Sequence, residues 1–227
     1  MNTFDIIKKI LDEKILVLDG AMGSLIQSYK LSEEDFLGEK FKNSNFFLQG
    51  NNDILSITQP EIIKNIHKQY LDVGADIIET NTFGANAFIQ ADYHLQDYVY
   101  EMNFEAAKIA KEIAENYTKL NPNKPRFVAG SLGPTNKTAS ISPDVNRPEF
   151  RSAYFDDFVN VYYEQVRGLV DGGVDILLVE TIFDTLNAKA AIFAIQKYLS
   201  EINKIIPVMI SGTIVDMSGR TLSGQTT

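Results

Sequence analysis

The sequence predicts an α/β fold in which short apolar strands alternate with helices and pair in parallel. The prediction rests on two near-copies of one phrase, Gly74–Thr80 and Gly173–Thr181. Each copy has a glycine, an aspartate, an apolar run and then Glu-Thr. A run that is apolar throughout is typical of a strand buried on both faces, as in parallel sheets that helices cover. Glu79 and Glu180 then stand where two buried strands end, which is where parallel α/β proteins bind ligands.

Charge, hydrophobic content and cysteine count together indicate which classes of protein this chain can belong to. The 227 residues carry a formal charge of −9, and 44% are hydrophobic, which is enough for a sizeable core. The acidic balance argues against a nucleic-acid partner. No run of 18 apolar residues and no signal-peptide pattern occurs, so we expect no membrane partner and a cytoplasmic location. The chain has no cysteine, which excludes a thiolate metal site within these residues.

The first unit begins with a short amphipathic helix over residues 3–12. An apolar strand, Ile15–Leu18, follows and ends at Asp19. A helix is expected over 21–29. The polar, asparagine-rich stretch over 31–58 is interpreted as an irregular insertion.

The middle of the chain repeats the pattern of helix and strand. Pro60 suits the first turn of a helix that runs to about Val73. The second strand covers Asp76–Thr80. A stripe of alanines and isoleucines predicts a long helix over 98–118, and the third strand follows at Phe127–Gly130.

The last third contains two more strands. The segment 132–150 is expected to be a long loop, and loops of that length tend to be functional. A helix over 154–171 leads to the fourth strand, Asp175–Glu180. A further helix over 184–200 leads to the fifth strand, Pro207–Gly212.

Five strand-helix units with the last helix missing predict an incomplete TIM (β/α)8 barrel. A complete barrel needs roughly 250 residues, and its units connect with right-handed crossovers. We therefore expect residues 1–227 to be the N-terminal portion of a barrel domain. An open, doubly wound sheet of five strands is the alternative.

Polar groups at the strand ends form the candidate site. The turn Asp19–Gly23 joins a strand to a helix, and its backbone N–H groups could hold an anion, although a plain tight turn explains it equally well. Glu79, Thr80 and Asn81 offer a carboxylate and polar side chains to a ligand. Glu180 could bind an ammonium group or form a salt bridge at the rim.

The remaining motifs do not indicate a function of their own. Gly219–Thr226 is close to a phosphate-binding P-loop, but Gln225 occupies the position of the required lysine, which argues against nucleotide binding. His67 and His94 are expected to be packing or surface residues. No lysine at a strand end suits an aldolase that forms a Schiff base.

Long motifs resemble the homocysteine S-methyltransferase family. They are Asp19–Gly23, Gly74–Phe83 and Gly130–Pro143. Two later stretches, Val179–Ala191 and Ile210–Thr227, are similar to the homocysteine-binding region of cobalamin-dependent methionine synthases within that family.

The resemblance implies a barrel that binds homocysteine at its strand ends. By resemblance, Asp19 and Glu180 hold the ammonium group of the amino acid. The backbone N–H groups of Gly20, Ala21 and Met22 hold its carboxylate. This placement is physically sensible, because carboxylates attract a cation and a helix N-terminus attracts an anion. The roles of the second strand-end motif, which includes Glu79, stay open.

The resemblance also implies cofactors that this chain does not hold alone. Family members bind zinc through three cysteine thiolates, and the zinc activates the homocysteine sulfur. In methionine synthases the methyl group comes from cobalamin, and downstream modules bind cobalamin and folate. We expect the zinc cysteines to lie beyond Thr227, so residues 1–227 contain no catalytic residue and transfer no methyl group alone. The alternatives are a betaine or S-methylmethionine methyltransferase and a non-catalytic amino-acid-binding protein.

Overall fold

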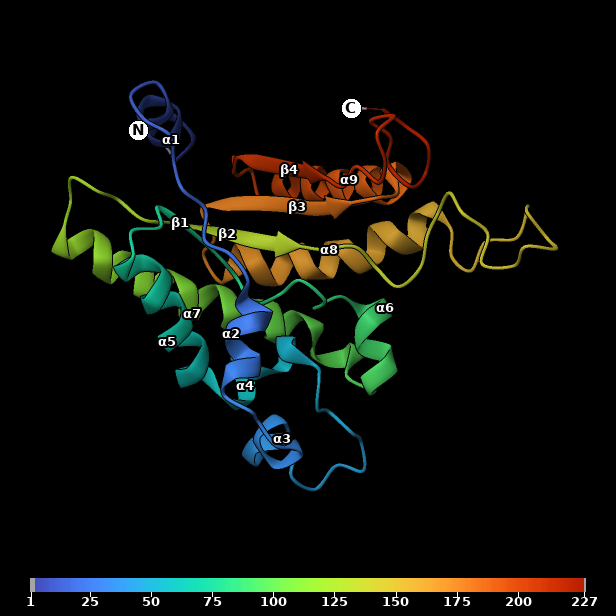
Figure 1. Cartoon of the computed structure of the whole chain (residues 1–227), viewed down its shortest axis with the longest axis horizontal. Helices are drawn as coiled ribbons and strands as arrows, with labels where there is room; N and C mark the ends of the chain where they lie inside the picture. The colour runs from blue at the N-terminus through green and yellow to red at the C-terminus, as the bar shows by residue number, and fades with distance from the viewer. Residues whose placement is uncertain (1–2, 227) are drawn as a thin grey trace.

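The computed structural model describes residues 3–226 and contains a parallel sheet of four strands in the order β1-β2-β3-β4. The strands are β1 (Ile77–Glu79), β2 (Phe127–Leu132), β3 (Ile176–Ile182) and β4 (Val208–Gly212). Spatial order follows chain order, and helices connect successive strands (Figure 1). This is the α/β architecture of an incomplete barrel, as predicted.

Nine α-helices are described within residues 3–226. They are α1 (Thr3–Leu11), α2 (Met22–Ser28), α3 (Glu33–Phe41), α4 (Leu55–Thr58), α5 (Pro60–Asp72), α6 (Ala87–Gln90), α7 (Val99–Leu120), α8 (Phe155–Asp171) and α9 (Thr185–Glu201). Short 3-10 turns cover Asn52–Ile54, Ala91–Tyr93 and Gln96–Tyr98. Each helix predicted from the sequence is present, with ends that differ by one or two residues. None of the helices in this range is long and apolar enough to cross a membrane.

The predicted first strand, Ile15–Leu18, is reduced to a single bridge. Leu18 pairs with Ile77 in parallel, so the segment lies beside β1 where a strand was expected. The N–H of Val17 is bound by the carboxylate of Asp76 at 3.0 Å and not by a backbone carbonyl. Ile15 is 86% exposed. The segment keeps a few backbone bonds to β1, such as the N–H of Asp19 to the carbonyl of Ile77 at 2.9 Å, but the Asp76 carboxylate takes the N–H of Val17, and the ladder does not extend into a full strand.

The interpretation of 31–58 as an irregular insertion is wrong. The segment contains α3 and α4, and its apolar side chains form part of a second core cluster. The buried members from this segment are Phe36, Phe41, Leu48, Ile54 and Leu55. Helix α3 begins at a capping box of Ser32 and Asp35. Gly38, at φ 51°, interrupts the regular helical geometry of α3.

The repeated phrase has a structural explanation. Gly74 and Gly173 have φ values of 110° and 97°, the left-handed conformation that commonly follows a helix end. The aspartate two residues later starts each strand and binds its neighbour. Asp76 accepts the N–H of Val17, and Asp175 accepts the N–H of Val128, both at 3.0 Å. In each copy of the repeated sequence, the glycine and the aspartate therefore fix the start of the strand, and the Glu-Thr pair marks its end.

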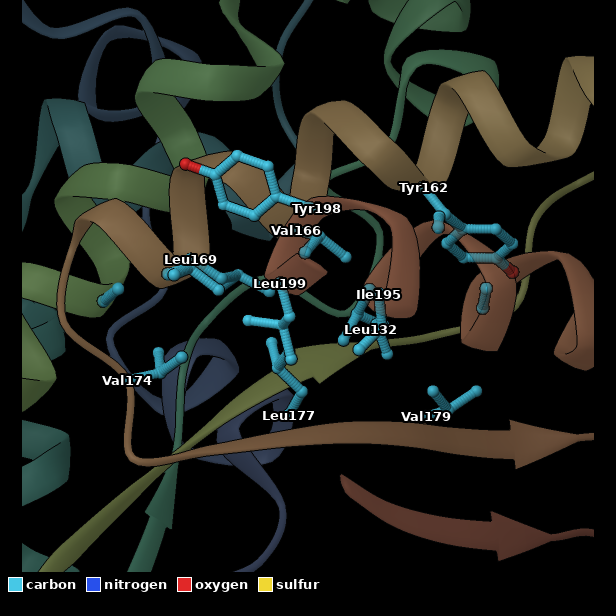
Figure 2. Close-up of a cluster of buried hydrophobic side chains, with 14 of the residues drawn as sticks. Leu132, Tyr162, Val166, Leu169, Val174, Leu177, Val179, Ile195, Tyr198 and Leu199 are labelled. Carbon is cyan, nitrogen blue, oxygen red and sulfur yellow. The ribbon is translucent and has the colours of Figure 1, made fainter. Parts of the chain in front are cut away.

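Apolar side chains cover both faces of the inner strands. The largest core cluster lies between the sheet and α8 and α9, where Leu177 and Val179 of β3 face Val166 and Ile195 (Figure 2). A smaller cluster on the opposite face packs against α1 through residues such as Ile7. Strand β4 differs, because four of its five residues are exposed. Burial on both faces explains the continuous apolar runs in β2 and β3.

Candidate functional site

An open cleft of about 590 Å³ lies at the carboxyl ends of β1, β2 and β3. All eight predicted site residues line it: Asp19, Gly20, Ala21, Met22, Glu79, Thr80, Asn81 and Glu180. Segments far apart in sequence therefore meet at one edge of the sheet. The long loop over 132–150 does not line this cleft, although it was expected to be functional. Its Ser140 instead binds the α9 cap, Asp184.

Three carboxyl groups converge in the cleft. Both carboxylate oxygens of Asp19 accept the N–H of Glu79 at 3.1 Å. This contact places Asp19 directly against the end of β1. The hydroxyl of Ser131, near the end of β2, donates to Glu180. Asp19 thus comes from the segment beside β1, Glu79 from the end of β1 and Glu180 from β3, with β2 lying between β1 and β3.

The carboxyl groups perturb one another. The pKa of Asp19 is raised to about 7, chiefly by burial; the N–H of Glu79 lowers this pKa and the charge of Glu180 raises it. Burial raises the pKa of Glu79 to about 8, with added contributions from Glu180 and Asp19. Crowded, half-buried carboxyl groups retain protons near neutral pH unless a cation is present. An ammonium group in the cleft would favour their ionised forms.

A bulge at the end of β3 positions Glu180. The pairing register between β3 and β4 shifts between Val179 and Ile182. Thr181 has φ 55°, which is unfavourable for a β-branched residue. Bulges re-aim side chains and occur next to active sites, and local backbone strain also concentrates there. The strained Thr181 therefore marks the carboxylate beside it as part of the site.

Thr80 belongs to a hydrogen-bonded floor. Its hydroxyl accepts the N–H of Ser131 at 3.0 Å and lies 2.6 Å from the hydroxyl of Thr82. Thr82 in turn donates to the carbonyl of Ser131 at 2.8 Å. The side chain of Gln165 donates to the carbonyl of Thr82 at 2.9 Å. The Thr80 hydroxyl is thus engaged within the protein, which fixes the floor below the carboxyl groups.

Asn81 also binds the protein. Its amide donates to the carbonyl of Asn52 at 2.7 Å, which joins the end of β1 to the segment before α4. On the other side of the cleft, Ala21 stands at the N-cap of α2 and makes no side-chain cap. Gly20, Ala21 and Met22 therefore contribute backbone to the lining where α2 begins.

The sequence analysis missed Asp53 and Ser131, which also line the cleft. Ser131 follows the apolar run of β2 just as Glu79 and Glu180 follow theirs, so the same signal could have found it. Asp53 lies within the segment interpreted as an insertion, and no signal pointed to it. Burial raises the pKa of Asp53 to about 7.

The residues present do not fit the zinc ion that the family resemblance implies. That ion requires three cysteine thiolates, and the chain contains no cysteine. Within residues 3–226, no group of three or more histidine, aspartate or glutamate side chains is arranged to hold a metal ion.

Comparison with known proteins identifies the family and the fold. Residues 16–227 match the family described as homocysteine S-methyltransferase. Crystal structures of the Escherichia coli homocysteine methyltransferase MmuM have a similar fold. The metallated form is 22% identical with a TM-score of 0.70, over 96% of this chain and 69% of that protein. The oxidised form is 22% identical with a TM-score of 0.72, over 100% of this chain and 70% of that protein.

The apo form of MmuM is 21% identical with a TM-score of 0.66, over 95% of this chain and 66% of that protein. At these identities the likeness to MmuM concerns the fold. The family match spans nearly the whole chain, from the segment beside β1 to the residues after β4. The chain therefore belongs to the homocysteine S-methyltransferase family.

Proposed function

We propose that this chain forms the homocysteine-binding part of a methionine synthase, which transfers a methyl group from methylcobalamin to homocysteine. In this proposal residues 1–227 are the N-terminal portion of the barrel domain. The observation that carries the proposal is the convergence of Asp19, Glu79 and Glu180 at the strand ends of a protein of this family. The choice of methionine synthase rests on the resemblance of 179–191 and 210–227, and it implies downstream modules that hold cobalamin and folate.

The proposed binding mode follows from charge. The ammonium group of homocysteine lies against Asp19 and Glu180, while its carboxylate faces the backbone N–H groups of Gly20, Ala21 and Met22. A bound ammonium lowers the pKa of nearby carboxyl groups, so binding releases protons around neutral pH. Affinity should therefore rise as the pH increases from about 6 to about 8.

Calorimetry with L-homocysteine tests this binding mode. Asp19→Asn and Glu180→Gln should each weaken binding about tenfold or more, since each removes a charge-assisted hydrogen bond. Homocysteine without its amino group, 4-mercaptobutanoate, should bind weakly to the wild-type chain. Glu149→Gln, which changes an exposed carboxyl that does not line the cleft, is the control and should bind as wild type. Equal affinity for homocysteine and 4-mercaptobutanoate would contradict the proposal.

A turnover assay tests the assignment of catalysis. Residues 1–227, supplied with homocysteine, zinc and methylcobalamin, should form no methionine, because the chain lacks thiolate ligands. Betaine and S-methylmethionine serve as alternative donors in parallel assays. Methionine formed by this chain alone would overturn the assignment, and the productive donor would name the activity.

A further inference from the structure

Asp53 is a buried carboxyl group at the cleft that the proposed binding mode does not use. It lies in the 3-10 turn before α4 and is only 9% exposed. Burial dominates its raised pKa, with no contribution from the three-carboxyl cluster. No lysine, arginine or histidine within residues 3–226 forms a salt bridge with it at 4.0 Å or less. A buried carboxyl without a cation lowers stability, so its presence requires an explanation.

The partners of Asp53 belong to the opposite segment of the cleft. One carboxylate oxygen accepts the N–H of Gly84 at 3.1 Å. The other accepts the side-chain amide of Gln90 at 3.4 Å, and that amide also donates to the carbonyl of Gly84 at 3.0 Å. Gly84 has no room for a side chain, because an added Cβ would lie 2.7 Å from Asp53. The carboxyl group is packed directly against the backbone of Gly84.

A second bond joins the same two segments. The amide of Asn81 donates to the carbonyl of Asn52 at 2.7 Å. Residues 81–84, here called the cleft wall, are therefore held at both ends by residues 52 and 53. All four wall residues line the cleft. The position of the cleft wall therefore determines the shape of the cleft beside the end of β1.

An amide at position 53 fits these neighbours less well than the carboxylate does. The side-chain oxygen of Gln90 accepts from Asn51 at 2.7 Å, which turns the Gln90 amino group toward residue 53. Residue 53 then faces two donors, the Gly84 N–H and the Gln90 amino group, and the Gln90 amino group also faces the carbonyl of Gly84 and, at 3.3 Å, the side-chain oxygen of Asn51. A carboxylate offers two acceptor oxygens, whereas an asparagine offers one oxygen and presents an amino group to the other donor.

We infer that Asp53 is a positioning residue for ligand binding, whose carboxylate sets the cleft wall and thereby the affinity for homocysteine. The predicted effect of Asp53 on the affinity for homocysteine rests on the proposed function. Its predicted effect on the order of the cleft wall does not. A group that lowers stability yet orders the lining of a cleft is typical of a functional site.

Hydrogen–deuterium exchange of Asp53→Ala and Asp53→Asn tests the positioning role. At about pH 8.5, where Asp53 is ionised, exchange of the wall amides should rise about tenfold in both variants. Exchange in β2 should stay at the wild-type rate. His67→Gln is the matched control, because His67 is buried, its ring nitrogens have no partner among the described residues, and it lies outside the cleft lining. This variant should leave exchange of the wall unchanged.

Calorimetry with L-homocysteine on the same three variants completes the test. Both Asp53 variants should bind about fivefold to tenfold more weakly than wild type, and His67→Gln should bind equally well. The inference fails if wall exchange stays within about twofold of wild type, if exchange rises equally in β2, or if the wall loosens without loss of affinity. If the wild-type chain binds no homocysteine, the proposed function fails, and the exchange result alone decides whether Asp53 positions the wall.

Discussion

Two carboxyl groups at the cleft, those of Glu79 and Asp19, make the fold less stable as the pH rises from acidic values to about 8. The pKa of Glu79 is about 8 in the folded chain and near 4.5 without the fold, so the folded state retains a proton that the unfolded state loses. Stability therefore falls as pH rises between those two values. Asp19, with a pKa of about 7, acts in the same direction. The cluster is most strained when it is fully ionised and no cation is bound.

Glu79→Gln should make the chain more stable at alkaline pH. The neutral amide removes the charge that the fold disfavours, so Tm at about pH 8.5 should exceed that of wild type, while Tm at about pH 4 should be nearly unchanged. Thermal melts at both pH values measure the effect. Glu149→Gln removes an exposed carboxyl and should shift neither value. A lower Tm for Glu79→Gln at pH 8.5 would show that its carboxylate stabilises the fold.

Sequence reasoning at the residue scale found the groups that end apolar runs. Glu79, Glu180 and Asp19 stand out because a charged residue directly after a buried strand has few places to lie except the sheet edge. Asp53 could not be found in this way. Its site depends on contacts with Gly84 and Gln90, more than 30 residues away, which no local pattern records.

At the scale of elements, α7 and α8 pack unusually closely. A Cβ added at Gly168 would lie 2.6 Å from the carbonyl oxygen of Tyr100 and 2.7 Å from Cβ of Asn103. A Cβ at Gly172 would meet Ala107 at 2.6 Å. Two glycines one turn apart therefore let the helix backbones approach each other beneath the sheet.

Gly168→Ala should destabilise the chain although alanine favours helices. Overpacking a close contact costs about 1–3 kcal/mol, which exceeds the propensity gain of about 1 kcal/mol. Denaturant melts measure the loss. Gly212→Ala in β4 is the control, because an added Cβ there meets nothing within 4 Å. Equal stability of Gly168→Ala and wild type would mean that the two helices can separate at little cost.

Elements were predictable where local pattern and tertiary burial agree. Helices α5, α7, α8 and α9 have apolar stripes that match their buried faces, and the sequence locates them within two residues. Helix α3 was missed because its nine residues are mostly polar and only Phe36 and Phe41 are buried, which is too few to form an apolar stripe. The segment Ile15–Leu18 is apolar enough for a strand, but its burial depends on neighbours that a local pattern does not describe.

At the scale of the whole molecule, the sheet that the structure describes ends in an exposed edge strand, β4. Strand β4 pairs with β3 on one side, and within residues 3–226 no strand pairs with its other side. The exposed strand carries apolar side chains, with Val208 at 40% and Ile210 at 60% exposure. Exposed, unpaired strands with apolar residues promote association between chains. The parallel order of the sheet was predictable from the apolar runs, whereas the exposure of β4 follows from its place at the end of the sheet.

Self-association through β4 should therefore depend on the charge of this edge. Residues 1–227 should form dimers or larger species at about 50 µM, and Ile210→Lys should shift them toward monomer because a lysine on an edge strand opposes pairing. Sedimentation velocity measures the distribution. Val145→Lys adds the same charge at a loop position that is 95% exposed and should leave association unchanged. Tm should stay near the wild-type value in both variants, since neither side chain is buried.

A wild-type chain that sediments as a monomer at this concentration would show that the edge of β4 is already protected. An equal effect of both lysines would assign the change to net charge instead of to β4.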